Sequence, residues 1–226
     1  MNKITFALVF VVLFCGAGFA IGNATATYAG SSKYNGTSAG SMVMEGGNIT
    51  GISVATNTST EKWAGMYGNV SGQIVLARAG TSPYMYSWTW SAANTGEVCA
   101  STNSAPVWTA LAAATRAAID SAWAFTTTDA DSATSTLSDA SGYVNVNTQG
   151  VTGAAAYTRN TTDATAWQTV AIAGLGGSTK APYGFCVNVS SVKSNFAGES
   201  VNFQLIVPTN QTDATYETYY FYVELV

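Results

Sequence analysis

The fold class follows from the last segment of the sequence, Tyr216-Glu217-Thr218-Tyr219-Tyr220-Phe221-Tyr222-Val223-Glu224-Leu225-Val226. Side chains alternate between the two faces of a β-strand. One face of this segment would carry Tyr216, Thr218, Tyr220, Tyr222 and Glu224, and the other Glu217, Tyr219, Phe221, Val223 and Leu225. Both sets are largely apolar or aromatic, as is typical of a strand covered on both sides. The segment therefore predicts a layered β structure.

Similar patterns recur upstream. Val201, Phe203, Leu205 and Val207 alternate with other side chains, and Tyr84, Tyr86, Trp88 and Trp90 fall on one face of a further strand. Strands are also predicted at 52–56, 73–77, 97–100, 143–147, 165–173 and 185–189, and on both sides of a Gly46-Gly47 turn within 42–50. The pattern predicts one mainly β domain, a β-sandwich or jelly-roll-like fold over residues 42–226.

One segment changes its period. After Pro106, apolar residues recur every three or four positions at Trp108, Leu111, Ile119 and Trp123. Proline suits the first turn of a helix, and the alanines between these positions favour helix. We therefore predict a helical insertion at about 106–121. The small, polar stretch 126–141 is either a loop or a short second helix.

The composition excludes several functions. Charged residues make up 9% of the chain, the net charge is −4 and there is no histidine. A slightly acidic chain gives no reason to expect a nucleic-acid partner, which requires clustered basic residues. The lack of histidine excludes His-based triads and His-ligated metals. We find no catalytic set, so we expect a protein that is not an enzyme and uses no cofactor.

Residues 1–20 have the pattern of a signal peptide. Lys3 precedes an uncharged run from Ile4 to Phe14, and Gly18-Phe19-Ala20 fits a cleavage site after Ala20. The alternative is a retained membrane anchor, since the apolar stretch to about Ile21 is just long enough to span a bilayer. With cleavage, we expect a secreted, extracellular protein with no membrane attachment.

Two cysteines remain after such a cleavage. In an exported protein Cys99 and Cys186 are expected to form a disulfide, which would stabilise the fold by roughly 4 kcal/mol. Two buried thiols are the alternative. Eight Asn-x-Ser/Thr sequons also follow the leader, at Asn23, Asn35, Asn48, Asn57, Asn69, Asn160, Asn188 and Asn210. They predict N-linked glycans on exposed surfaces.

Two further groups of residues are candidate binding sites. Asp129, Asp131 and Asp139 offer the oxygen ligands that calcium prefers, although they lack the spacing of a calcium loop, and a solvated helix-capping loop is the alternative. The six tryptophans would stack on sugar faces if they were exposed. The favoured interpretation of the tryptophans is that they belong to the core and to interfaces.

Several stretches resemble secreted surface proteins of archaea. They are Glu45-Gly46-Gly47-Asn48-Ile49-Thr50, Trp63-Ala64-Gly65-Met66-Tyr67-Gly68-Asn69-Val70-Ser71-Gly72, Ile119–Phe125 followed by Ala130–Ala133, Gln204–Pro208 and Tyr219–Leu225. The resemblance covers residues from about 42 to 225. It implies an extracellular or cell-surface location in an archaeon, makes heavy glycosylation and a disulfide more credible, and carries over no catalytic residue.

These observations favour a structural role. The hypothesis is a subunit of an extracellular filament or pilus-like assembly that polymerises head to tail by β-strand donation to copies of itself. Residues 21–41 would form an extended arm whose Ile21, Ala24, Ala26 and Ala29 pair with a neighbour, and Tyr216, Tyr220 and Tyr222 would add interface area. The alternatives are a surface-lattice subunit and a secreted module that binds carbohydrate or protein.

Overall fold

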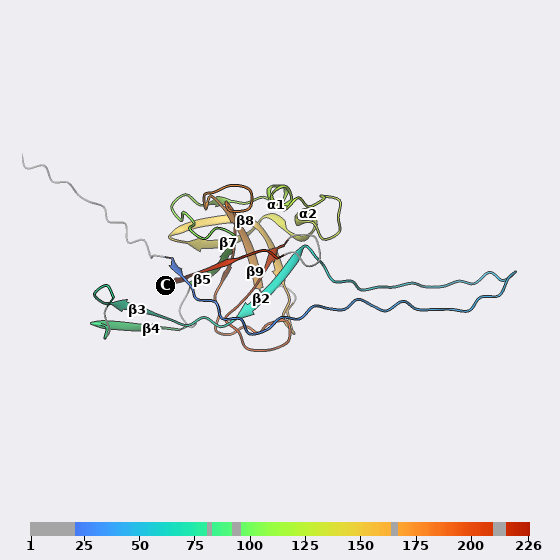
Figure 1. Cartoon of the computed structure of the whole chain (residues 1–226), viewed down its shortest axis with the longest axis horizontal. Helices are drawn as coiled ribbons and strands as arrows, with labels where there is room; N and C mark the ends of the chain where they lie inside the picture. The colour runs from blue at the N-terminus through green and yellow to red at the C-terminus, as the bar shows by residue number, and fades with distance from the viewer. Residues whose placement is uncertain (1–20, 81–82, 92–95, 164–166, 210–215) are drawn as a thin grey trace, which may run out of the picture.

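The computed structural model describes residues 21–80, 83–91, 96–163, 167–209 and 216–226 (Figure 1). The predicted signal peptide and Asn210 lie outside these residues. Strands make up 37% of the chain and helices 6%. The structure is consistent with a β-sandwich that carries a small helical insertion, so the predicted fold class is confirmed.

The main sheet contains eight strands. Its order is β1 (Gly22–Asn23), β12 (Tyr220–Leu225), β5 (Gly96–Ser101), β10 (Gly184–Asn188), β9 (Trp167–Ala173), β8 (Gln149–Thr158) and β7 (Ser138–Val146), with β6 (Ala112–Ala113) paired to β9. A second sheet pairs β2 (Trp63–Gly68) with β11 (Phe203–Pro208). A third pairs β3 (Gly72–Leu76) with β4 (Tyr86–Trp90). All of these pairs are antiparallel.

The main sheet is covered on both faces. On one face, Trp167 and Phe185 form a core with Leu205 of β11 and Ile119 of the first helix. On the other face, the sheet curls until β7 contacts β5 and β10, so that Val144 joins Cys186 in a second core. Burial on both sides explains why strand β5, from Gly96 to Ser101, is buried at every position.

The predicted disulfide is confirmed. Cys99 of β5 and Cys186 of β10 are direct partners across the two central strands, and their sulfurs are bonded. Both cysteines lie in the second core with 2% exposure or less. The bond joins positions 87 residues apart in the sequence, at the middle of the main sheet.

The helix begins later than predicted. Helix α1 covers Arg116–Trp123, because Thr115 caps it by accepting a hydrogen bond from the Ala118 amide at 3.3 Å. The preceding Ala112–Ala113 pairs with β9 instead, and the Val107 amide donates to the Leu175 carbonyl. A second short helix, α2 (Ala133–Thr136), lies within 126–141, which settles that alternative in favour of the helix.

The predicted strands at 42–50 and 52–56 are absent. The structure has only the turn at Gly46–Gly47, and between residues 24 and 62 no strand is assigned. The segment is extended but lies away from the body of the molecule, where it finds no partner strand (Figure 1). The last strand is also shorter than predicted, since it starts at Tyr220 instead of Tyr216.

A buried carboxylate ties the two helices together. Asp120 of α1 is almost fully buried and accepts hydrogen bonds from the Ala133 and Thr134 amides of α2, at 2.7 and 3.0 Å. The Thr134 hydroxyl donates to it as well. Asp120 therefore satisfies amides at the start of α2 that have no partner within that helix.

We predict that Asp120→Ala lowers the free energy of unfolding by about 2 to 4 kcal/mol, because the α2 amides would be buried without acceptors. The matched control is Asp139→Ala, which removes a carboxylate that pairs with Arg116 on the surface. We expect a loss of at most about 1 kcal/mol for the control. Urea denaturation measures both values, and equal losses would contradict this role of Asp120.

Candidate functional site

Two extended segments leave the body at opposite ends of the molecule (Figure 1). We call residues 25–58 the long arm. All of them are exposed, and the arm doubles back at the Gly46–Gly47 turn. Near its base the Thr37 amide donates to the Asn57 carbonyl at 3.1 Å, and the Asn57 amide donates to the Thr37 hydroxyl at 3.3 Å. The two limbs of the arm are thereby held level with one another.

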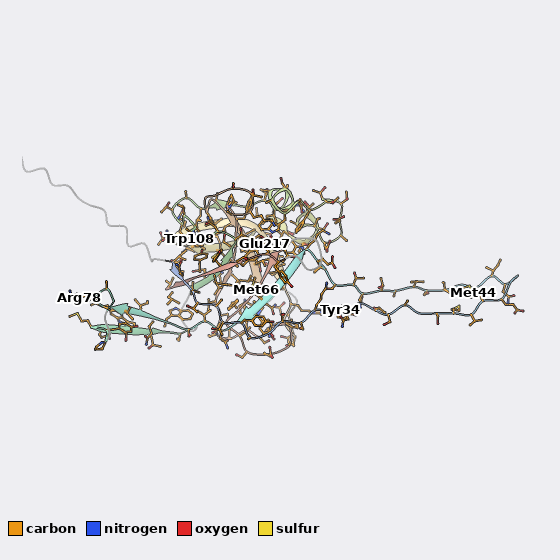
Figure 2. The ribbon with its side chains drawn as sticks, in the orientation of Figure 1. Tyr34, Met44, Met66, Arg78, Trp108 and Glu217 are labelled. Carbon is orange, nitrogen blue, oxygen red and sulfur yellow. A yellow bond between two sulfur atoms is a disulfide. The ribbon has the colours of Figure 1, made fainter. Side chains whose placement is uncertain are left out.

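The long arm is unusually apolar for an exposed segment. Its exposed large side chains are Tyr28, Tyr34, Met42, Val43, Met44, Ile49, Ile52 and Val54. Between Tyr34 and Thr60 the only charged residue is Glu45. Figure 2 places Tyr34 near the body and Met44 close to the far end. Contiguous exposed apolar surface of this kind marks an interaction site in soluble proteins.

The second segment is the β3–β4 hairpin. Its register places Ile74 opposite Trp88 and Leu76 opposite Tyr86. These four side chains therefore share one face, and each is 46 to 54% exposed. The rings of Tyr86 and Trp88 contact one another, with centroids 4.3 Å apart. Such an exposed apolar face on a two-stranded hairpin is a candidate binding surface.

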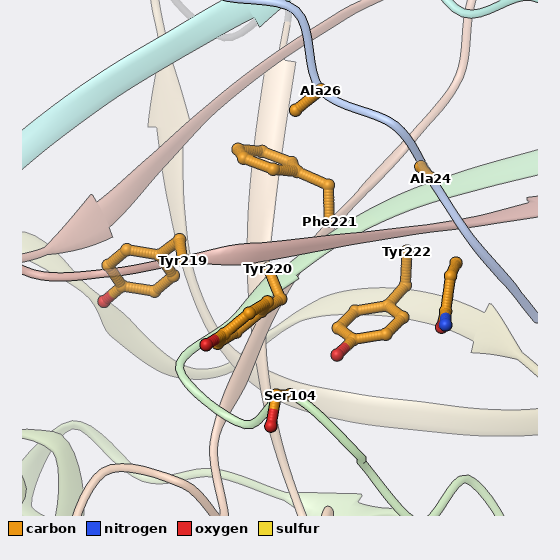
Figure 3. Close-up of a pocket in the computed structure, with 8 residues that line it drawn as sticks. Ala24, Ala26, Ser104, Tyr219, Tyr220, Phe221 and Tyr222 are labelled. Carbon is orange, nitrogen blue, oxygen red and sulfur yellow. The ribbon is translucent and has the colours of Figure 1, made fainter.

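The N-terminal segment lies on the edge of the main sheet. Gly22 pairs with Val223 and Asn23 with Tyr222, and the Ala24 amide donates to the Phe221 carbonyl at 3.0 Å. Figure 3 shows the shallow pocket that results, about 230 Å³ in volume. It is lined by Asn23, Ala24, Ala26, Ser104 and Tyr219–Tyr222. The donor segment predicted from the sequence thus covers strand β12 of its own chain.

The residues predicted for a polymer interface differ in accessibility. Ile21 packs against the second core and Ala24 is half-buried, whereas Ala26 and Ala29 are exposed. Tyr216 and Tyr220 are also exposed. The prediction that Tyr222 adds interface area is wrong. Its side chain is 2% exposed, and its hydroxyl donates a hydrogen bond to the Asn103 carbonyl at 2.6 Å. That side chain holds the fold together and adds nothing to an outer surface.

The aspartates do not form the calcium site considered from the sequence. Lys62 lies 3.1 Å from Asp129 and 2.7 Å from Asp131, so an ammonium group occupies the position between these carboxylates. The hydrogen bond to Asp131 raises the pKa of Lys62. Asp139 is bound elsewhere, by Arg116 at 3.0 Å. Within the described residues, no group of three metal-ligating side chains is found.

Six of the eight sequon asparagines are exposed, namely Asn23, Asn35, Asn48, Asn57, Asn69 and Asn188. The prediction of an exposed sequon is wrong for Asn160. It is buried, and its side-chain oxygen accepts a hydrogen bond from the Thr162 amide at 2.9 Å. Asn160 is therefore not the exposed attachment site that the sequence predicted. The exposed sequons lie on the long arm, on β1 and around the ends of strands.

Most tryptophans are part of the protein interior. Trp90, Trp123 and Trp167 are buried, and Trp63 and Trp108 pack against the two cores. Trp88 is the exception, with half of its surface exposed on the β3–β4 hairpin. The sequence indicated the interior role of this residue type, but it did not single out Trp88.

The sequence pattern did not indicate a pair of buried carboxyl groups that the structure contains. Glu97 of β5 and Glu224 of β12 are direct cross-strand partners, with exposures of 9 and 3%. Glu224 accepts a hydrogen bond from the Asn147 amide at 2.6 Å, whereas the Oε2 atom of Glu97 is buried without a partner in the described part of the chain. Burial, reinforced by the charge of Glu224, raises the pKa of Glu97 to about 7.

This pair makes stability depend on pH. The folded chain keeps a proton on Glu97 up to a pH of about 7, whereas the unfolded chain loses it near 4.5. The stabilisation is therefore complete below pH 4.5 and is lost as the pH rises through 7. We predict that Glu97→Gln raises the free energy of unfolding at pH 8 by roughly 2 to 3 kcal/mol and changes it little at pH 4.

Urea denaturation at the two pH values measures this effect. The matched control is Glu45→Gln, the same substitution on the exposed long arm, which is expected to leave the pH dependence unchanged. An unchanged pH dependence in Glu97→Gln would contradict the assignment to this pair.

Two further findings bear on the kind of protein to which this chain belongs. In the ranges that the structure describes, none of the helices has the length and apolar character needed to cross a membrane. Comparison of the chain with protein-family models, with curated proteins and with solved structures finds no match. A function for this chain therefore has to be inferred from the geometry of its described residues.

Proposed function

We propose that the chain is a structural subunit of an extracellular homopolymer, a filament in which each copy binds the next head to tail. The observation that carries this proposal is the placement of the long arm and the β3–β4 hairpin at opposite ends (Figure 1). Both expose apolar side chains that their own chain does not cover. Two different surfaces at opposite ends give a contact that does not close on itself, which produces a filament.

The long arm has the backbone properties of a donor segment. It is extended over residues 25–58, with few main-chain hydrogen bonds to the rest of its chain. Free amides and carbonyls of an extended segment pair readily with the edge of a sheet or a hairpin in another copy. Polymerisation by strand donation would supply those partners.

The N-terminal segment suits an exchange between copies. Its strand β1 contains only two residues, so little pairing is lost when it leaves β12 of its own chain. The same register, Gly22 with Val223 and Asn23 with Tyr222, is available on a neighbouring copy. Exchange of an identical element is a low-cost route to assembly.

The remaining surface suits an extracellular location. Few side chains are charged, six sequons are exposed and the central strands are joined by a disulfide. Disulfides persist in oxidising compartments, and glycans would solubilise a surface that has little charge. We therefore place the polymer outside the cell, with N-linked glycans on its outer faces.

A carbohydrate-binding module is the second candidate. The contacting rings of Tyr86 and Trp88 on the β3–β4 hairpin offer the kind of surface on which sugars stack. This function predicts a monomer whose ligand binding is lost in Trp88→Ala, and the experiment below separates the two candidates.

We predict that the purified chain forms regular filaments in negative-stain electron microscopy, with an intact mass above that of the polypeptide. Deletion of residues 21–31 should abolish or strongly shorten the filaments, since β12 would lose its donor. The control is Val192→Ser, which removes an exposed apolar side chain that belongs to neither extended segment.

The outcomes separate the hypotheses. Filaments that persist after the deletion would exclude residues 21–31 as the donor. A monomer at all concentrations would overturn the proposed function and favour the binding module, and flat sheets would indicate a surface lattice.

A further inference from the structure

We propose that the apolar face of the β3–β4 hairpin is the docking surface for the long arm of the next copy. This inference rests on the proposed function and deepens it by naming the two surfaces that meet. The occupant is a second copy of the chain, and the contact joins the two extended segments seen at opposite ends in Figure 1.

The receiving surface is the face formed by Ile74, Leu76, Tyr86 and Trp88. The opposite face of the hairpin carries Gln73, Val75, Ser87 and Thr89, which is more polar. The hairpin is thus amphipathic, a pattern that arises where one face packs on another layer. The described residues of its own chain leave this face open, since each of its four side chains is about half exposed.

The long arm has matching apolar side chains. Met42 and Met44 lie on one limb, just before the Gly46–Gly47 turn, and Ile52 and Val54 lie on the returning limb. All four are exposed. The arm thus offers four apolar side chains to the four on the hairpin.

The charges of the two tips are complementary. In a chain with 9% charged residues, Glu45 is the only charge between Tyr34 and Thr60, and it lies beside the turn of the arm. Arg78 is the only charge between Gly72 and Ser91, and Figure 2 places it on the β3–β4 hairpin. Opposite charges on the two segments favour their encounter over the encounter of two like segments. Since the two segments leave opposite ends, they meet only between copies.

Packing of these faces would form a small two-layer β structure at each junction of the filament. Trp88 would then be buried between the layers, although half of it is exposed in the single chain. Aromatic anchors of this kind supply much of the binding energy of an interface. The junction would thereby cover both surfaces that the single chain leaves open.

The test uses charge reversal on the full chain. We expect Glu45→Arg and Arg78→Glu each to weaken self-association by about fivefold in sedimentation velocity, and the double variant to recover most of the loss. The control is Arg159→Glu, a charge reversal at an exposed residue of the body, which should leave association unchanged. Single variants without effect, or a double variant weaker than both, would overturn the proposed charge complementarity.

A second test addresses the apolar faces. Trp88→Ser should weaken association at least tenfold, whereas Val192→Ser should not. Chains carrying Met44→Cys and chains carrying Ile74→Cys, which keep Trp88, are then mixed under mild oxidation, and a covalent dimer should form between the two kinds of chain. Circular dichroism with thermal unfolding confirms that the variants keep the folded body.

The remaining outcomes are decisive as well. Filaments that form normally with Trp88→Ser and without cross-linking would overturn this inference and leave the proposed function standing. A wild-type chain that stays monomeric would overturn both. Binding of Trp88 to lipid vesicles or to an oligosaccharide, without any change in self-association, would assign the hairpin to that ligand instead.

Discussion

The fold depends on the pairing of β5 with β10 on one side and with β12 on the other. Every residue of β5 is buried, because the strand separates the two cores of the sheet. The bond between Cys99 and Cys186 joins β5 to β10 at the middle of this arrangement, between positions 87 residues apart in the sequence. A disulfide that closes so long a loop restricts the unfolded chain, by roughly 4 kcal/mol in the loop-entropy description. The other elements are positioned relative to this ladder.

The body and the two extended segments satisfy different physical requirements. In the body, strands find partners on both sides and apolar side chains meet across two cores. In the long arm and the β3–β4 hairpin, the chain keeps strand-like geometry and apolar side chains but lacks a second layer. With so few charges on the chain, repulsion between copies is weak. In the proposed polymer, association would remove these surfaces from water.

Much of the fold was predictable because it depends on local pattern. Alternation along Phe203–Val207 was sufficient for the fold class. The leader-like pattern of residues 1–20, which leaves Cys99 and Cys186 as a pair in an exported chain, was sufficient for the disulfide. Features decided by distant partners were not predictable. Residues 42–56 have the alternation of strands, but a strand also needs a neighbour. Ala112–Ala113 pairs with β9, so the helix begins later in the sequence than predicted. Lys62 is far in sequence from Asp131, and the Glu97–Glu224 pair exists only through the register of β5 and β12.

The pairing of Gly22 with Val223 also constrains the timing of folding. Two segments so far apart in sequence meet only after nearly all of the described chain has been synthesised and, for an exported protein, translocated. Contacts of such long range form slowly, since the loop between them must close first. Until then the edge of β12 does not exist as a template. In the proposed polymer, strand exchange at β12 would therefore be open only to a subunit whose last strand has folded.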